Sequence, residues 1–187
     1  MVILVGIQQK VEQMRMGARP IYPYDSGLIC AMLNVRPGAK VLEAGTGSGG
    51  FTAYLGELGA NVLSYEKNKQ FYEIAKENLK GYRNVRVRLG DVSWVKEKNF
   101  DVLFLDLQWP DKMVTRLKNR VKKGGYIGIY TPIMDDIKPV WSVLEKNFIN
   151  VRGVLLDHKE IQVKKYARIK GMLGFPGFFI WAETRQK

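Results

Sequence analysis

Apolar residues recur along this chain in short runs, and the segments between the runs carry apolar residues at helical spacing. The runs predict strands at 40–43, 61–65, 85–89, 100–105, 126–130, 151–156 and 178–183. The intervening periodicity predicts helices at 26–33, 51–58, 68–79, 111–120 and 135–147. Alternating strands and helices indicate an α/β fold whose seven-stranded sheet is mostly parallel and carries helices on both faces.

Prolines and glycines set the expected boundaries. The two prolines of 19–26 are expected to forbid a helix there, so that Asp25 caps a helix beginning at Ser26. The run Lys122-Lys123-Gly124-Gly125 reads as a turn before the fifth strand. We expect residues 1–36 to form an N-terminal extension with a lead-in helix, and residues 37–187 to form the main domain.

The stretch Val41-Leu42-Glu43-Ala44-Gly45-Thr46-Gly47-Ser48-Gly49-Gly50 predicts a strand, a glycine turn and a helix start that presents backbone N–H groups to a ligand. It lacks the lysine of a Walker phosphate loop, which excludes that site. A dinucleotide site stays formally possible, because Gly45, Gly47 and Gly50 satisfy G-x-G-x-x-G. Glu43 would repel a pyrophosphate and attract an ammonium or sulfonium cation. A purely structural turn is the alternative.

Acidic residues follow four of the predicted strands. They are Glu43, Glu66, Asp91 and Asp106. Any one of them could serve as a helix cap. Ligands of open α/β sheets bind beyond the carboxyl ends of the strands, where these four carboxylates would meet. The sequence therefore predicts one acidic site at this edge of the sheet.

Composition narrows the function further. A chain of 187 residues is long enough for one domain with a sizeable core. Its net charge of +12 predicts attraction to a polyanion, nucleic acid first. The single cysteine, Cys30, and the single histidine, His158, cannot build a metal cluster or a disulfide, so we expect no metal and a reducing compartment. No apolar run is long enough to span a membrane, so we expect a cytoplasmic protein.

The acid followed by Gly-x-Gly-x-Gly resembles the first motif of class I S-adenosylmethionine (SAM) methyltransferases, which have a Rossmann-like fold. Further segments resemble the tRNA (adenine-N1) methyltransferases that modify an adenine of the T-loop. They are 21–25, 37–38, 41–50, 64–66, 84–86, 104–107, 109–110 and, more loosely, 174–182. The chain departs from that family in three ways: it has little room for a β-rich N-terminal domain, Tyr24 replaces a lysine, and Phe175-Pro176 replaces His-Thr.

This resemblance and the strand-end positions together suggest a role for each site residue. The cofactor would contact Tyr22, Glu43, Gly45, Thr46, Gly47, Ser48, Gly49, Glu66, Asp91 and Asp106. Glu43 would pair with the SAM ammonium or order the loop, Glu66 would accept the ribose hydroxyls, and Asp91 would accept the adenine amine. Asp106 is the catalytic candidate: a carboxylate at the exocyclic amine would orient the target base and stabilise the cationic N1-methyladenine.

The basic residues would then bind tRNA phosphates. The candidates are Arg15, Arg19, Lys159, Lys164, Lys165, Arg168 and Lys170. The target adenine has to leave its stack, and Trp109 could line its pocket. The resemblance also implies a homo-oligomer, a tetramer in that family. Two alternatives remain open: a SAM methyltransferase acting on another RNA base or on a small molecule such as a corrin precursor, and a non-catalytic RNA-binding subunit.

Overall fold

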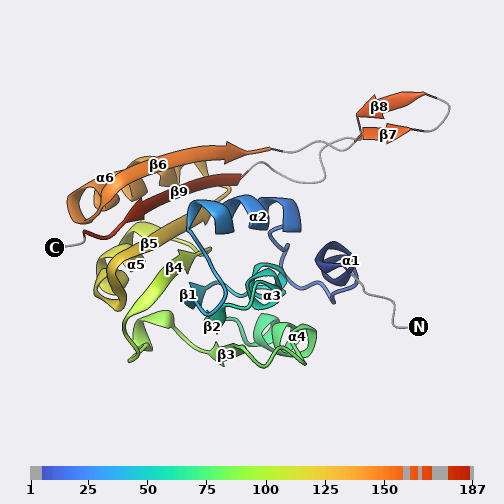
Figure 1. Ribbon diagram of the computed structural model, residues 1–187, viewed down its shortest axis with the longest axis horizontal. Helices are drawn as coiled ribbons and strands as arrows, with labels where there is room; N and C mark the ends of the chain where they lie inside the picture. The colour runs from blue at the N-terminus through green and yellow to red at the C-terminus, as the bar shows by residue number, and fades with distance from the viewer. Residues whose placement is uncertain (1–5, 158–160, 164–165, 170–176, 186–187) are drawn as a thin grey trace.

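The computed structural model describes residues 6–157, 161–163, 166–169 and 177–185. Its main sheet contains β1 (Lys40–Ala44), β2 (Asn61–Glu66), β3 (Val85–Leu89), β4 (Phe100–Leu105), β5 (Val121–Thr131), β6 (Ile149–Leu156) and β9 (Gly177–Glu183). Their order is β3-β2-β1-β4-β5-β9-β6 (Figure 1). The pairs from β3 through β5 are parallel, and β9 runs antiparallel to both β5 and β6. The prediction of a mostly parallel seven-stranded α/β sheet is confirmed.

Helices cover both faces of this sheet (Figure 1). On one face lie α2 (Pro23–Met32), α3 (Gly50–Glu57) and α4 (Lys69–Asn78), with α1 (Ile7–Glu12) packed outside α3. On the other face lie α5 (Pro110–Leu117) and α6 (Ile137–Asn147). Three short 3-10 helices, η1 (Val92–Trp94), η2 (Lys118–Arg120) and η3 (Met134–Asp136), complete the connections. The division after residue 36 stays a prediction.

The central strands are buried on both sides, which is why their sequences read as continuous apolar runs. Toward α2 and α3, the ring of Phe104 packs against Phe51 with centroids 4.2 Å apart. Toward α5 and α6, the buried side chains of Leu103 and Ile127 join one cluster with Leu144. The sheet is therefore a rigid platform, and the loops at its edges are free to carry function.

Two local predictions were wrong. The helix expected to begin at Ser26 begins at Pro23, with Tyr22 at the N-cap and Asp25 inside the first turn. A proline is well tolerated at the first helical position, where its missing N–H has no partner to lose. The turn expected at 122–125 is part of β5, which is one strand from Val121 to Thr131 with a register shift opposite Phe100 to Val102. A bulge of this kind accommodates the glycine pair without ending the strand.

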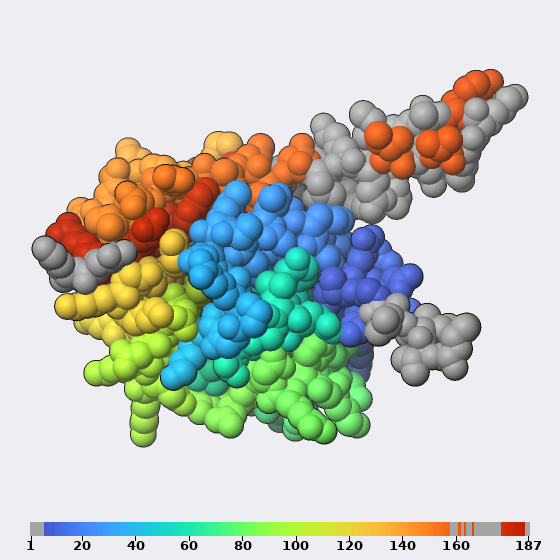
Figure 2. Space-filling view, in the orientation of Figure 1, coloured from blue at the N-terminus to red at the C-terminus, as the bar shows by residue number. Residues whose placement is uncertain are grey.

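A second, two-stranded sheet falls in the segment for which the sequence predicted no regular element. It pairs β7 (Ile161–Val163) with β8 (Ala167–Ile169) in antiparallel register. Both strands lie apart from the body that the main sheet and its helices form (Figure 2). The exposed side chains of Ile161 and Val163 belong to this hairpin. Across the described residues, no helix combines the length and the apolar character that crossing a membrane would need.

Candidate functional site

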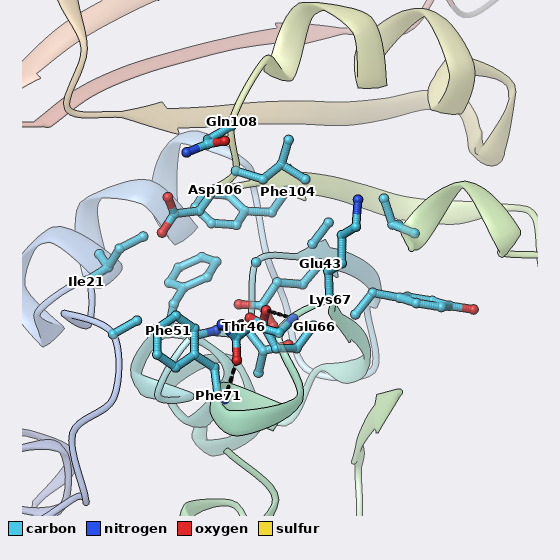
Figure 3. Close-up of a pocket in the computed structure, with 18 of the residues that line it drawn as sticks. Ile21, Glu43, Thr46, Phe51, Glu66, Lys67, Phe71, Phe104, Asp106 and Gln108 are labelled. Carbon is cyan, nitrogen blue, oxygen red and sulfur yellow. Dashed lines mark hydrogen bonds between the residues drawn. The ribbon is translucent and has the colours of Figure 1, made fainter. Parts of the chain in front are cut away.

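A cavity of about 760 Å³ lies beyond the carboxyl ends of β1, β2, β3 and β4 (Figure 3). This is the edge where chain connections diverge to the two sides of β1, which is where open α/β sheets bind ligands. Five segments line the cavity: 18–21, 43–51, 65–71, 90–92 and 104–113 contribute residues to its wall. The volume is in the range of a small-molecule or cofactor site.

Gly45, directly after β1, packs against the backbone of Asp106, directly after β4. Its φ is +95°, and a Cβ at this position would lie 1.8 Å from the carbonyl oxygen of Asp106. The amide of Asp106 donates to the carbonyl of Ala44 at 2.9 Å, and the Gly45 amide donates to the Tyr65 carbonyl at 3.0 Å. Only glycine permits so close an approach of two backbones. The glycine loop and Asp106 are thereby held against each other.

Glu66 holds the other side of the same loop. Its carboxylate accepts the Gly47 amide at 2.9 Å and the Asn68 amide at 2.8 Å, one on each oxygen. The side chain is buried yet lines the cavity (Figure 3). Each oxygen keeps acceptor capacity for a ligand. The predicted bond from Glu66 to ribose hydroxyls stays a prediction. Thr46 also lines the cavity, and its hydroxyl lies 2.6 Å from that of Ser64.

Glu43 lies at the floor of the cavity, within β1. It is 1% exposed and accepts a hydrogen bond from the Thr52 hydroxyl at 2.7 Å. Burial raises the pKa of Glu43 to about 7, against the effect of hydrogen bonds from Thr52 and Ser64. A cation placed above this floor would lower that pKa again and be held by the resulting charge. The bond to Thr52 shows how the carboxylate is oriented from α3.

Asp106 points its carboxylate into the cavity from the loop after β4 (Figure 3). Burial, and secondarily the charge of Glu66, raises the pKa of Asp106 to about 7. In the described part of the chain, no group donates a hydrogen bond to this carboxylate. The carboxylate is half-buried in the wall of the cavity, so its unpaired oxygens are accessible to a ligand that enters. Asp106 is therefore poised to accept a ligand N–H.

Asp91 is both a helix cap and a residue of the cavity wall, the two alternatives that the sequence left open. It caps η1, accepting the Ser93 amide at 2.8 Å, and it also lines the cavity. Hydrogen bonds from Ser93 come first among the causes that lower its pKa, and Lys67, whose Nζ lies 3.9 Å from Oδ2, adds to them. Asp91 is thus ionised and fixed in the wall of the cavity. Its contact with an adenine amine stays a prediction.

Three of the predicted cofactor residues do not line the cavity. The Ser48 hydroxyl accepts the amides of Gly17 and Ala18 at 2.9 and 3.1 Å and donates to the Ala18 carbonyl at 2.5 Å. Gly49, at φ +90°, packs toward Leu79. Tyr22 stacks on Tyr24 with ring centroids 5.6 Å apart. Ser48 and Gly49 thus shape the glycine loop, and Tyr22 lies outside the cavity wall. The remaining candidates line the cavity: Glu43, Gly45, Thr46, Gly47, Glu66, Asp91 and Asp106.

The segment that covers the glycine loop, residues 15–21, was not predicted to do so. Residues 15–21 cross the loop, and the backbone of Arg15 exchanges hydrogen bonds with the side chain of Asn78 at 3.0 and 2.9 Å. A Cβ on Gly50 would lie 2.6 Å from Pro20 Cβ, so the cover packs directly on the start of α3. Arg15 and Asn78 are 63 positions apart in the sequence, so the local spacing of apolar and polar residues does not predict their contact.

The structure locates the basic candidates only in part. Arg19 lines the cavity, and the side chain of Arg15 is exposed beside it on the same segment. Arg168 falls within β8, while Lys159, Lys164, Lys165 and Lys170 lie outside the described residues. Trp109, also a lining residue, is 63% exposed, and Lys112 Nζ lies 5.4 Å from its ring centroid. An exposed indole at a cavity mouth offers a stacking surface.

The donor set of the cavity favours an organic cation. Among the described residues, no three His, Cys, Asp or Glu side chains are grouped in a way that could hold a metal ion. The acids of the cavity are accompanied by apolar walls from Phe51, Phe71 and Phe104. Such a site fits a ligand with polar ends, a positive charge and an aromatic portion.

Comparison with known proteins finds relatives that are named as tRNA methyltransferases. The profile of the family described as "tRNA methyltransferase complex GCD14 subunit" matches residues 14–173. A "tRNA (adenine(58)-N(1))-methyltransferase TrmI" from Thermus thermophilus is 30% identical over 158 residues, covering 80% of this chain and 62% of that protein. A "tRNA (adenine(57)-N(1)/adenine(58)-N(1))-methyltransferase TrmI" from Methanocaldococcus jannaschii is 30% identical over 211 residues, 93% of this chain and 74% of that one.

The fold has solved counterparts. The crystal structure of the tRNA (m1A58) methyltransferase TrmI from Aquifex aeolicus superposes with a TM-score of 0.88 at 23% identity, covering 98% of this chain and 77% of that one. This chain therefore spans less than two thirds of the Thermus relative and about three quarters of the other two.

Proposed function

Because this chain belongs to the GCD14 family of tRNA methyltransferase complex subunits, we propose that it methylates N1 of a T-loop adenine in tRNA with SAM as the methyl donor. The observation that carries the proposal is the carboxylate of Asp106. It lies in the cavity, beside the glycine loop, with its acceptor capacity unused among the described residues. The resemblance noted in the sequence and the family match point to the same activity.

The cavity fits SAM by charge and by shape. Glu43 and Glu66 would place negative charge near the ammonium and the ribose of the cofactor, while Phe71 and Val92 would give its apolar portion a wall. Gly45 and Gly47 let the backbone approach the ligand without side chains in the way. SAM supplies a methyl group on sulfonium sulfur; the N1 lone pair forms the new N–C bond as the C–S electron pair leaves on sulfur.

Asp106 would act on the adenine during this transfer. The neutral N1 needs no base to activate it, and no proton moves in the methyl-transfer step. Positive charge grows on the ring as the bond forms, and an ionised Asp106 accepting an N6–H would stabilise it. The same hydrogen bond would fix the base in line with the methyl group. Asp106 is thus the proposed catalytic residue, and its raised pKa predicts weaker activity below about pH 7.

RNA would reach the cavity over a basic surface. Arg19 and Lys67 line the cavity, and Lys112 Nζ lies over the ring of Trp109, another lining residue. A partner rich in phosphates would bind with an affinity that falls steeply with salt. By the family resemblance, we also propose tRNA as the partner and self-association into a tetramer, which multi-angle light scattering of the chain measures.

The test is methylation of an unmodified tRNA transcript with labelled SAM, followed by nucleoside analysis. The wild-type chain should form N1-methyladenosine, and Asp106→Asn should lose at least about 100-fold in kcat. SAM affinity, measured by calorimetry, should change much less than kcat. SAM binding without N1-methyladenosine would contradict the proposed activity, and a methylated product at another atom would identify the other-base alternative. Absence of SAM binding would identify a non-catalytic subunit.

A further inference from the structure

Gln108 is a polar residue of the cavity that the proposed reaction has not used. It is exposed and, like Asp106, lines the cavity (Figure 3). Among the described residues, the amide of Gln108 makes no hydrogen bond. It therefore offers one free acceptor and two free donors at the point where the proposed base would sit.

The local backbone explains why Gln108 faces the cavity. The Asp106 amide still pairs with the Ala44 carbonyl, and the chain bends at residues 107–109 directly after β4. Leu107 packs against the core cluster of the α5 side and anchors this bend. Asp106 and Gln108, on either side of Leu107, both line the cavity. Trp109 then takes a left-handed conformation at φ 52°, and Pro110 begins α5, which fixes where Gln108 lies.

We propose that Gln108 and Asp106 together read the target base as adenine, with Gln108 binding its N6 and N7 atoms. This inference rests on the proposed function. A glutamine amide pairs with adenine in two parallel hydrogen bonds: Oε1 accepts one N6–H, and Nε2 donates to N7. Asp106 accepts the second N6–H, on the side of N1. All polar atoms of that edge are then used except N1, which stays free to attack the methyl group.

The pair also rejects the other purine. Guanine carries an acceptor oxygen where adenine carries N6, so an ionised Asp106 would face that oxygen without a proton between them. A site that leaves a buried polar group unpaired discriminates strongly. Gln108 alone could rotate its amide to suit either purine, but Asp106 cannot supply a donor when it is ionised. The two residues therefore determine base identity jointly, and Gln108 supplies the contact to the far edge of the ring.

The test replaces the target adenosine in a T-arm RNA by 7-deazaadenosine, in which N7 is a C–H group. Each RNA is methylated by the wild-type chain and by Gln108→Met, which keeps the side-chain length without hydrogen-bonding groups. We expect the wild type to lose about tenfold in kcat/KM on the deaza RNA. The variant should lose about tenfold on the adenosine RNA and lose nothing further on the deaza RNA.

The comparison of two enzymes on two RNAs cancels any change that the deaza ring makes in the reactivity of N1. Gln13→Met is the matched control: Gln13 is exposed and lies outside the cavity, so this variant should show the wild-type ratio of the two RNAs. Equal wild-type rates on both RNAs, or an equal deaza loss in Gln108→Met, would overturn the role of Gln108 while N1 methylation stands. No N1-methyladenosine from any enzyme would instead overturn the proposed function itself.

Discussion

The substitution Gly45→Ala tests the contact on which the cavity is built. A Cβ at this position would lie 1.8 Å from the Asp106 carbonyl oxygen, whereas such contacts essentially never fall below 3.0 Å. The ends of β1 and β4 must therefore move apart by more than an ångström. That movement breaks the backbone hydrogen bond from Asp106 to Ala44 and carries the Asp106 carboxylate away from the loop.

The expected cost has two parts. An alanine at φ +95° costs about 1–2 kcal/mol in backbone strain. Losing one or two buried backbone hydrogen bonds adds about 2–3 kcal/mol. The free energy of unfolding should fall by about 3–5 kcal/mol in all, which corresponds to a fall of roughly 6–20 °C in Tm for a chain of this size. SAM affinity should fall by at least about tenfold, because the loop and Asp106 lose their relative position.

Gly38→Ala is the matched control for strain alone. Gly38 has a φ of +81°, and a Cβ there would meet nothing within 4 Å. It should cost only the strain of about 1–2 kcal/mol, and SAM affinity should be unchanged. Differential scanning fluorimetry and calorimetric titration with SAM measure both variants side by side. Equal losses of Tm in the two variants, with equal SAM affinity, would refute the claim that Gly45 is required by the close approach of Asp106.

Two further predictions concern the floor and the cover of the cavity. Burial raises the pKa of Glu43 from 4.5 to about 7, so between these pH values the folded chain binds more protons than the unfolded chain. The free energy of unfolding without ligand should therefore fall as the pH rises through this window. Glu43→Gln should therefore raise Tm at pH 8, flatten the dependence of Tm on pH and weaken SAM binding; a Tm lowered equally at pH 5 and pH 8 would contradict this account. Ser48→Ala removes the acceptor of the Gly17 and Ala18 amides and should cost about 1–3 kcal/mol, with faster proteolysis of the cover segment. Ser142→Ala, on the exposed face of α6, is the control for Ser48→Ala and should leave the free energy of unfolding and the rate of proteolysis unchanged.

The strand-end acids illustrate what could be predicted without coordinates. Alternating apolar runs fix the strands, and the parallel topology that they imply places the ends of those strands at one edge. Glu43, Glu66, Asp91 and Asp106 were predicted to meet on that basis, and all four line the cavity. Their roles toward SAM and adenine stay predictions, because a position at the edge does not specify which ligand atom a carboxylate contacts.

Local signals misled at two places. Pro23 reads as a helix breaker but stands at the first position of α2, where a proline costs nothing. The glycine pair at 124–125 reads as a turn but lies within β5, because Val121 before it pairs with Phe100 of β4, and Tyr126 after it pairs with β4 and β9. For the glycine pair, strand pairing outweighed a local propensity of about a kilocalorie per residue. For Pro23, the position within the helix decided the effect of the residue.

The sequence by itself determined the seven strands of the main sheet and the order of the helices between them, the glycine turn, the four acids at the strand ends and the family. Each of these is written in residue types at short spacing. Only the tertiary structure decided that Ser48 holds the cover through Gly17 and Ala18, that Gly45 must lack a side chain because of Asp106, and that Gln108 faces the same cavity. The first two of these contacts join residues 30 or more positions apart, and the third depends on how β4 leaves the sheet. Such relations are set by packing in three dimensions, which no periodicity along the chain encodes.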